Sequence, residues 1–166
     1  MSRRRIVGDV IDHYKQHLDG LPVVVFSVSV MHSRLMAAEF KAAGYEARVV
    51  WGNMDKRERE AAIYGLADGS VQVVCSCDVI SEGVDVPVMA GAILLRRTQS
   101  LGLYLQQAGR ALRLSEGKSR ALILDHAGNY QIHGHVIADR YWSLDARARR
   151  ERGEEPPTTT TCPACY

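Results

Sequence analysis

Hydrophobic residues in this chain follow two alternating patterns, one spaced for helices and one packed into short continuous runs. Apolar side chains recur at helical spacing from Ile6 to Leu18, which predicts a first helix covering one face of a sheet. Val23–Phe26 is an unbroken apolar run, typical of a parallel strand buried on both faces. A second helix is expected over residues 32–43, because Gly44 stands where a helix commonly ends.

The same alternation continues along the chain. It predicts strands at 47–50, 71–76, 92–95 and 120–124, and helices at 55–67 and 100–111. Strands that alternate with helices favour an α/β fold, an open parallel sheet with helices on both faces. Ligands bind such sheets at the carboxyl ends of the strands, so we expect the loops after Phe26, Ser76 and Leu95 to form the functional edge.

Composition adds a few limits to this picture. The net charge of +2 neither supports nor excludes a nucleic-acid partner, since a local basic groove can hide in a balanced total. No apolar run approaches the roughly 20 residues that span a bilayer, so no membrane partner is expected. The basic start of the chain is followed by Asp9 and Asp12 and does not resemble a signal peptide, so we expect a cytoplasmic protein.

The four cysteines fall into two pairs with different expected roles. Cys75 and Cys77 point the same way along a predicted strand, which favours small core residues over a disulfide. Cys162 and Cys165 have the spacing of zinc ligands, but structural zinc sites need four, and nothing in the sequence places His133 or His135 near them. We therefore expect no metal site in this chain, and zinc only in a longer protein.

The pattern also divides the chain. We expect one domain over residues 1–145, a polar linker over 146–161, and at 162–166 the truncated start of a zinc ribbon.

Asp125, His126 and Asn129 form a polar cluster after the last strand. No nucleophile is paired with them in the sequence, so we interpret the cluster as hydrogen-bonded structure, not as a catalytic triad.

The segment Gln106–Arg113 carries the strongest candidate chemistry. Arg110 and Arg113 lie three residues apart, which on a helix places them on one face. Gly109 precedes the first arginine and allows close approach of a ligand or backbone. Arginine presents a planar fork of donors that matches phosphate oxygens, so the pair suits the charge that develops in phosphoryl transfer. The alternative is a solvated helix face.

The loop Cys77–Pro87 offers a second candidate site. It combines a strand end, a short turn, Gly83 for close approach, and the carboxylate of Asp85 just beyond. Such a carboxylate can accept hydrogen bonds from the hydroxyls of a ribose. The alternative is a turn in which Asp85 caps local backbone.

Four segments together resemble the C-terminal RecA-like domain of superfamily 2 helicases of the DEAD/DEAH type. Val23–Ser27 resembles motif IV, Trp51–Arg59 the His-Gly turn and its following helix, Cys77–Pro87 motif V, and Gln106–Arg113 motif VI. The four segments have the order and spacing of that family, and together they cover roughly residues 20–125. The later stretch 124–129 resembles phage helicases and RadD-like DNA-repair helicases. The resemblance implies a RecA-like fold.

The resemblance assigns roles at the ATP site. Arg110 and Arg113 match the arginines that reach the γ-phosphate of ATP, and Gln106 matches the glutamine that couples the two sites. Gly83, Asp85 and Gly109 match positions near the nucleotide.

Four further positions match the family's nucleic-acid track. Ser27 matches a position that touches the nucleic-acid backbone through its hydroxyl or N–H, which fixes position without reading sequence. Gly52, Cys77 and Asp78 are assigned to the same track. Cys77 stands where many relatives have threonine. Trp51 replaces the usual histidine and is expected to pack rather than to stack on a base.

The sequence lacks half of an ATPase. It contains no Gly-x-x-x-x-Gly-Lys-Ser/Thr loop: Gly117–Ser119 resembles its tail, but Leu112 stands at the first glycine position, so we expect a turn. It also lacks an Asp-Glu-x-Asp/His run to hold Mg²⁺. We expect ATP with Mg²⁺ to be bound mainly by a missing N-terminal RecA-like domain of the same protein.

The resulting hypothesis is the second motor domain of an ATP-dependent helicase that acts on DNA, with RNA not excluded. On its own the chain is expected to be an inactive half. Two alternatives stay open: a non-catalytic RecA-like module that binds nucleic acid or protein, and the motor of a restriction or remodelling translocase.

Overall fold

A five-stranded parallel sheet forms the centre of the molecule. The computed structural model describes residues 3–77 and 88–140. The strands stand in the order β2-β3-β1-β4-β5, and all neighbours are parallel. Their bounds are β1 Val23–Phe26, β2 Ala47–Trp51, β3 Val73–Cys77, β4 Gly91–Leu94 and β5 Leu122–Asp125. The predicted open parallel sheet of an α/β fold is confirmed.

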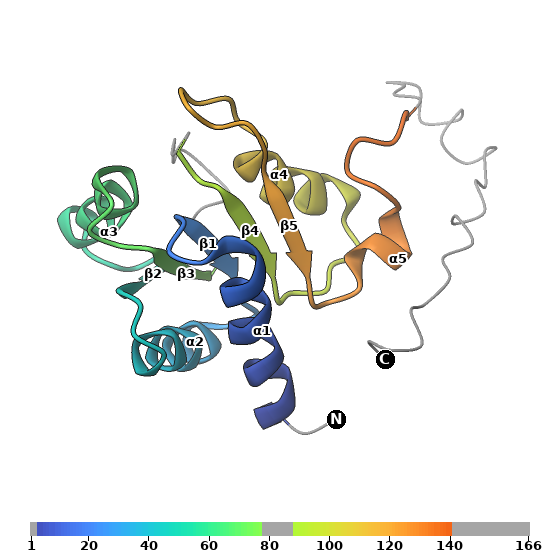
Figure 1. Cartoon of the computed structure of the whole chain (residues 1–166). Coiled ribbons are helices and arrows are strands. Elements are labelled where there is room, and N and C mark those ends of the chain that lie inside the picture. The colour runs from blue at the N-terminus through green and yellow to red at the C-terminus, as the bar shows by residue number, and fades with distance from the viewer. Residues whose placement is uncertain (1–2, 78–87, 141–166) are drawn as a thin grey trace.

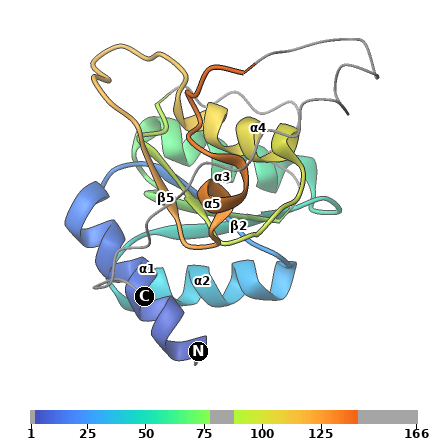
Figure 2. The ribbon, with the colours of Figure 1, turned by 90° about the vertical axis from the view of Figure 1, so that its right-hand side faces the viewer.

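Helices cover both faces of the sheet (Figures 1 and 2). They are α1 Arg3–Leu18, α2 Val30–Ala42, α3 Lys56–Asp68, α4 Leu101–Ala111 and the short α5 Asn129–His133. Figure 2 shows α1 and α2 on one side of the sheet and α3 and α4 on the other. Alternate residues of the central strands face opposite sides, so Val23 and Val25 pack with α1 and α2, and Val24 and Phe26 with α3 and α4.

An aromatic cluster anchors α1 to the sheet. The Tyr14 ring makes edge contacts with Phe40 at 5.2 Å and with Tyr45 at 4.8 Å between centroids. Its hydroxyl donates to the carbonyl of Leu21 at 2.9 Å, which satisfies the polar end of the buried side chain. Burial raises the pKa of the Tyr14 hydroxyl, so this group stays protonated and keeps its role as a donor.

Gly91 is required where α1 comes closest to the sheet. A Cβ at this position would lie 2.7 Å from Cδ1 of Leu18 and 2.9 Å from the carbonyl oxygen of Leu122. The second contact is backbone and cannot move away as a side chain can. The close packing of α1 against β4 and β5 therefore depends on the missing side chain.

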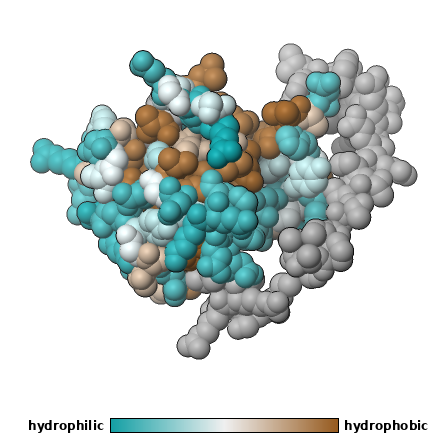
Figure 3. Space-filling model, viewed as in Figure 1, coloured by the Kyte–Doolittle hydropathy of each residue, from teal (hydrophilic) through white to brown (hydrophobic). Residues whose placement is uncertain are grey.

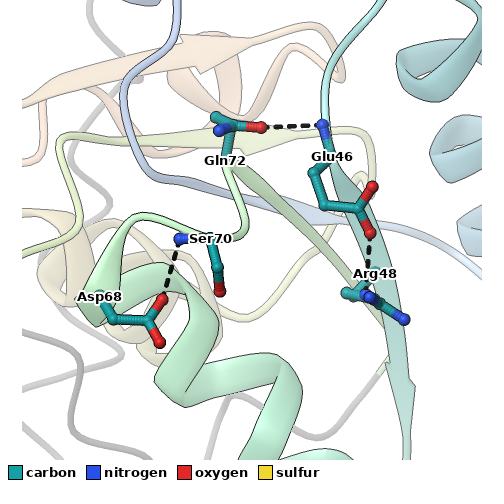
Figure 4. A network of polar contacts seen from close by, with 5 residues as sticks. All are labelled: Glu46, Arg48, Asp68, Ser70 and Gln72. Carbon is teal, nitrogen blue, oxygen red and sulfur yellow. Dashed lines mark hydrogen bonds and ion pairs between the residues drawn. The ribbon is translucent and has the colours of Figure 1, made fainter.

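Polar contacts fix the amino ends of β2 and β3, at the edge away from the predicted functional loops (Figure 4). The Glu46 N–H donates to Oε1 of Gln72 at 2.8 Å, and the Gln72 N–H donates to the Glu46 carbonyl at 3.0 Å. Glu46 also pairs with Arg48 at 3.1 Å. Asp68 accepts from the Ser70 N–H at 2.8 Å where α3 ends. The two hydrogen bonds between Glu46 and Gln72 hold the starts of the two strands in register.

Side-chain caps begin three of the helices. Ser29 accepts from the His32 N–H, Asp55 from the Arg57 and Glu58 N–H groups, and Ser100 from the Leu103 N–H. The cap at Asp55 and the end of α3 at Gly69 agree with the expected positions.

Two strands start later than predicted, and one helix was missed. β3 begins at Val73 because the Val71 N–H donates to Gly65 and so belongs to the end of α3. β5 begins at Leu122, the partner of the first residue of β4. No helical period is visible over Asn129–His133, because α5 has only five residues.

The structure also bears on the expectations for the cysteines, membrane spans and domain boundaries. Cys75 and Cys77 are buried and are not joined in a disulfide, as predicted. Within the described ranges no helix has the length and hydrophobicity to cross a bilayer. The linker 146–161 and the Cys162–Cys165 segment lie outside the described residues, so the predicted boundaries stay predictions.

Candidate functional site

The carboxyl ends of the strands gather several predicted site residues at one edge. Trp51, next to Gly52, stands opposite Cys77 in the β2–β3 register. The Ser27 N–H donates to the Ser76 carbonyl at 2.9 Å, which joins the ends of β1 and β3. Fold topology thus brings the predicted nucleic-acid positions Ser27, Gly52 and Cys77 to the same edge of the sheet.

Ser27 is less accessible than the sequence suggested. Its N–H is already used in the sheet, and its side chain is only 1% exposed. The hydroxyl has no hydrogen-bond partner among the described residues. The backbone N–H of Ser27 is therefore not available to a phosphate in this structure. A contact through the hydroxyl stays a prediction, and it requires that this buried group become accessible.

An arginine lies over Trp51 at the same edge. The guanidinium carbon of Arg34, on α2, is 5.3 Å from the centroid of the Trp51 ring, a cation–π arrangement. Gly52 is exposed, and its carbonyl accepts from Nη1 of Arg59 at 3.3 Å. Trp51 is half-buried, which agrees with the expected packing role. Gly52 itself is open to an incoming ligand.

Three of the predicted site residues of motif VI lie on α4: Gln106, Gly109 and Arg110. Gln106 is exposed, and Gly109 is half-buried with open space where a Cβ would stand. Arg110 lies in the last turn and is 8% exposed. Burying a guanidinium is unfavourable unless polar partners hold it, so the side chain has a defined orientation.

Arg113 lies beyond the helix. α4 ends at Ala111, where the sequence predicted its end, and Leu112 is its C-cap; the geometry of two arginines at i and i+3 on one helix therefore does not apply to Arg113. Two carbonyls at this end of the helix, those of Ala111 and Arg113, accept hydrogen bonds from a side-chain donor further along the chain. Arg113 is half-buried in the segment that follows.

That donor is Lys118. Its Nζ donates to the Ala111 carbonyl at 2.5 Å and to the Arg113 carbonyl at 2.8 Å. Gly117 takes a left-handed φ of 74°, and the Lys118 N–H donates to Ser115, so residues 115–118 form a turn. Gly117–Ser119 is therefore a turn, as predicted, and its lysine caps the C-terminal end of α4.

Replacing Lys118 with methionine is expected to loosen this cap. The variant keeps the apolar stem but leaves the carbonyls of Ala111 and Arg113 without their charged donor, at a cost of about 1 kcal/mol for a partly solvated group. Urea unfolding of the chain measures the loss. Lys41→Met, at an exposed lysine of α2, is the matched control. Equal stability of the two variants would contradict the cap.

A second set of hydrogen bonds holds the beginning of α4. The side chain of Asn129 is fully buried. It accepts from the Thr98 N–H at 2.9 Å and donates to the Arg96 carbonyl at 3.0 Å. It also donates to the Asp125 carboxylate at 3.3 Å. Asp125 and Asn129 are thus a hydrogen-bonded polar cluster, as the sequence predicted.

His126, the third member of that cluster, faces a different element. Its Nε2 lies 3.5 Å from Nδ1 of His13 on α1, and the rings are 5.0 Å apart. Burial lowers the pKa of His126, and His13 lowers it further, while Asp125 and Asp9 act in the opposite sense.

Stability is expected to fall as the pH drops below 6.5, the ordinary pKa of histidine. Because the pKa of His126 in the folded state lies below that value, the unfolded chain binds the proton more tightly than the folded chain. Protonation therefore lowers the free energy of unfolding. His126→Gln removes the titrating group, so its stability should vary less between pH 7.5 and pH 5.5. Urea unfolding at both pH values measures this, with His135→Gln as control. An unchanged pH dependence would refute the role of His126.

Three predicted positions lie outside the described residues: Asp78, Gly83 and Asp85. The ribose and phosphate roles proposed for this loop therefore stay predictions. Across residues 3–77 and 88–140, no group of three or more histidine, cysteine or acidic side chains is arranged to hold a metal ion.

Sequence reasoning missed three features of the site. These are the Lys118 cap, the contact of Asn129 with the loop before α4, and the stacking of Tyr104 on His133 at 5.3 Å. Nothing in the sequence indicates that the residues of each pair are in contact. The third feature had one signal, because Tyr104 stands among apolar residues in the predicted helix 100–111.

Hydrophobic residues gather over α4 and the adjoining loop in Figure 3, where hydrophilic residues cover much of the rest of the view. Leu112 and Leu114, on either side of Arg113, are 41% and 93% exposed. The end of α4 thus presents apolar side chains beside its arginines.

Comparisons with known proteins agree with this geometry. Residues 4–115 match the helicase conserved C-terminal domain. The chain is 38% identical over 164 residues to a 51.5 kDa protein of a Lactococcus phage, which covers 98% of this chain and 36% of the phage protein. It is 37% identical over 102 residues to the Schizosaccharomyces pombe protein irc3, named as a mitochondrial ATP-dependent helicase, which covers 61% of this chain and 17% of irc3.

The fold agrees as well. The C-terminal domain of the DEAD-box protein Dbp5 superposes with a TM-score of 0.62 at 16% identity, over 77% of this chain and 74% of that domain. The chain spans only about a third of the phage relative and less than a fifth of irc3. The match over residues 4–115 and the five-stranded parallel sheet lead to one assignment. The chain belongs to the helicase conserved C-terminal domain family and carries the RecA-like fold of helicase C-terminal domains.

Proposed function

We propose that this domain is the second motor domain of an ATP-dependent nucleic-acid helicase or translocase. It supplies Arg110 and Arg113 to an ATP site shared with an N-terminal RecA-like domain, together with part of the nucleic-acid track. The observation that carries the proposal is Arg110, a buried arginine at the end of α4 within the motif order Gln106–Arg113. Membership in the helicase family supports it.

The chemistry follows from the arginine side chain. ATP with Mg²⁺ binds mainly to the N-terminal domain, and Arg110 and Arg113 approach the γ-phosphate when the two domains close. Their fixed positive charge stabilises the oxygens on which charge develops during transfer. Because burial already restricts the Arg110 side chain, little reorganisation is needed at that moment. Loss of the γ-phosphate removes the attraction, and the domains reopen.

The nucleic acid lies along the carboxyl edge of the sheet in this proposal. Gly52 is open at that edge, and Arg34 over Trp51 places a positive charge beside it. Contacts of this kind address the phosphate backbone and carry no sequence information. We propose DNA as the substrate because residues 124–129 resemble those of phage and RadD-like helicases.

The direct test is ATP hydrolysis by the protein that carries both RecA-like domains, with and without nucleic acid. We expect stimulation by DNA, measured separately for single-stranded DNA, duplex DNA and RNA. Stimulation by RNA alone would move the substrate to RNA. Unstimulated or absent hydrolysis would favour the non-catalytic binding module. Stimulation by duplex DNA without strand separation would indicate a translocase of the restriction or remodelling type.

A further inference from the structure

The beginning of α4 depends on one buried amide. The segment Arg96–Ser100 connects β4 to α4, and it contains no regular structure that would fix its path. Asn129 lies against it from α5, fully buried. Its side chain bonds to two backbone groups of the segment, the Arg96 carbonyl and the Thr98 N–H. One amide thus supplies an acceptor and a donor to the connecting segment, as a neighbouring strand would.

The amide has only one orientation that satisfies these partners. The Thr98 N–H needs an acceptor, whereas the Arg96 carbonyl and the Asp125 carboxylate need donors. Oδ1 therefore faces Thr98, and Nδ2 faces Arg96 and Asp125. Asp125 is itself fixed, because its second oxygen accepts from the Tyr130 N–H at 2.7 Å. The end of β5 thus sets the position of the amide.

The contacts continue from the connecting segment into α4. Oγ1 of Thr98 accepts from the Ser100 N–H at 3.0 Å, and Ser100 caps the helix through the Leu103 N–H at 3.3 Å. The Thr98 carbonyl lies 2.8 Å from Nε2 of His133, which must carry the proton because a carbonyl only accepts. Each bond fixes a backbone atom at or before the first turn of α4.

A second contact reaches the middle of the helix. The buried Tyr104 ring stacks on His133 at 5.3 Å between centroids, and its hydroxyl donates to the Gly134 carbonyl at 3.3 Å. Tyr104 is six residues before Arg110 on the same helix. A helix of this length is rigid, so the placement of its first two turns sets the direction of its last turn.

We propose that Asn129, held by Asp125, is a positioning residue for Arg110. It fixes the Arg96–Thr98 backbone and thereby the start of α4. The guanidinium at the far end of the helix is then already positioned for the γ-phosphate when the two domains close. The inference rests on the proposed function, because only an ATP site gives the placement of Arg110 a chemical consequence. Asn129 itself touches no substrate.

The test is steady-state ATP hydrolysis by the protein with both RecA-like domains, in the presence of saturating nucleic acid. Asn129→Ala is expected to lower kcat by about 10- to 100-fold, the range that follows from a displacement of about 1 Å in a catalytic group. KM for ATP should stay within about threefold, because the partner domain supplies most of the ATP contacts. Gln131→Ala, at an exposed position of the same helix, is the matched control.

Thr98→Val provides a second variant that leaves the backbone bonds of Asn129 in place. It removes only the acceptor of the Ser100 N–H, so kcat should fall by a smaller factor with KM again unchanged. Thermal unfolding shows that each variant is folded at the assay temperature. A folded Asn129→Ala or Thr98→Val protein with the kcat of the control would overturn the inference, and so would a loss confined to KM.

A double variant separates positioning from general damage. Arg110→Lys keeps a positive charge but lacks the planar guanidinium, so its contact with the phosphate depends less on the exact position of the helix. Adding Asn129→Ala to Arg110→Lys should then lower single-turnover hydrolysis by much less than it does in the wild type. Equal factors in both backgrounds would overturn the inference. If wild type and Arg110→Ala hydrolyse ATP equally, it is instead the proposed function that fails.

Discussion

Replacing Arg110 with alanine is expected to reduce nucleic-acid-stimulated ATP hydrolysis by at least roughly 10³-fold, the lower range for an arginine finger in phosphoryl transfer. The guanidinium is the group whose charge and planar donors match the transferring phosphate. Truncation removes it without disturbing the α4 backbone, which is held by Ser100 at one end and Lys118 at the other. The measurement is kcat in the two-domain protein.

The loss should be specific to the chemical step. Binding of a non-hydrolysable ATP analogue should change little, since in the proposed site the N-terminal domain provides most of the contacts to ATP. Arg48→Ala is the matched control, because Arg48 is an exposed arginine that pairs with Glu46 on the opposite edge of the sheet. A folded Arg110→Ala protein that keeps wild-type turnover would exclude the arginine-finger role.

Replacing Tyr14 with alanine is expected to produce the largest loss of stability among single changes on the α1 face, about 3–5 kcal/mol. The ring is fully buried and contacts both Phe40 and Tyr45 edge to face. Its removal leaves a cavity under α1 and an unpaired carbonyl at Leu21. Urea unfolding of the chain measures the change in free energy.

The conservative change separates the two contributions. Tyr14→Phe keeps the ring contacts and removes only the bond to Leu21, so it should lose about 1 kcal/mol. If Tyr14→Ala were no less stable than Tyr14→Phe, ring packing would not be what anchors α1.

The fold could be predicted because its signals are local. The run Val23–Phe26 contains only apolar residues, since both faces of β1 are buried. Asp55 and Gly69 bracket α3 through a side-chain cap and a left-handed glycine, which depend on their own immediate neighbours. Such features can be recognised from spacing alone.

The site was only partly predictable because its contacts join distant segments. Lys118 turns back to the carbonyls of Ala111 and Arg113, a contact that the spacing of the arginines does not indicate. α5 has no apolar period to reveal it, and its start is held by the Asp125 side chain after a left-handed Gly128. The burial of Ser27 likewise depends on packing around the end of β1.

The central claim is that this domain completes an ATP site across a domain interface, and closure of the two domains tests it most directly. Energy transfer between a dye on each RecA-like domain reports the distance when ADP–aluminium fluoride and DNA are added. We predict that the wild type closes and that Arg110→Ala binds the nucleotide but closes much less. Equal closure in both proteins would contradict the claim that Arg110 reaches the phosphate.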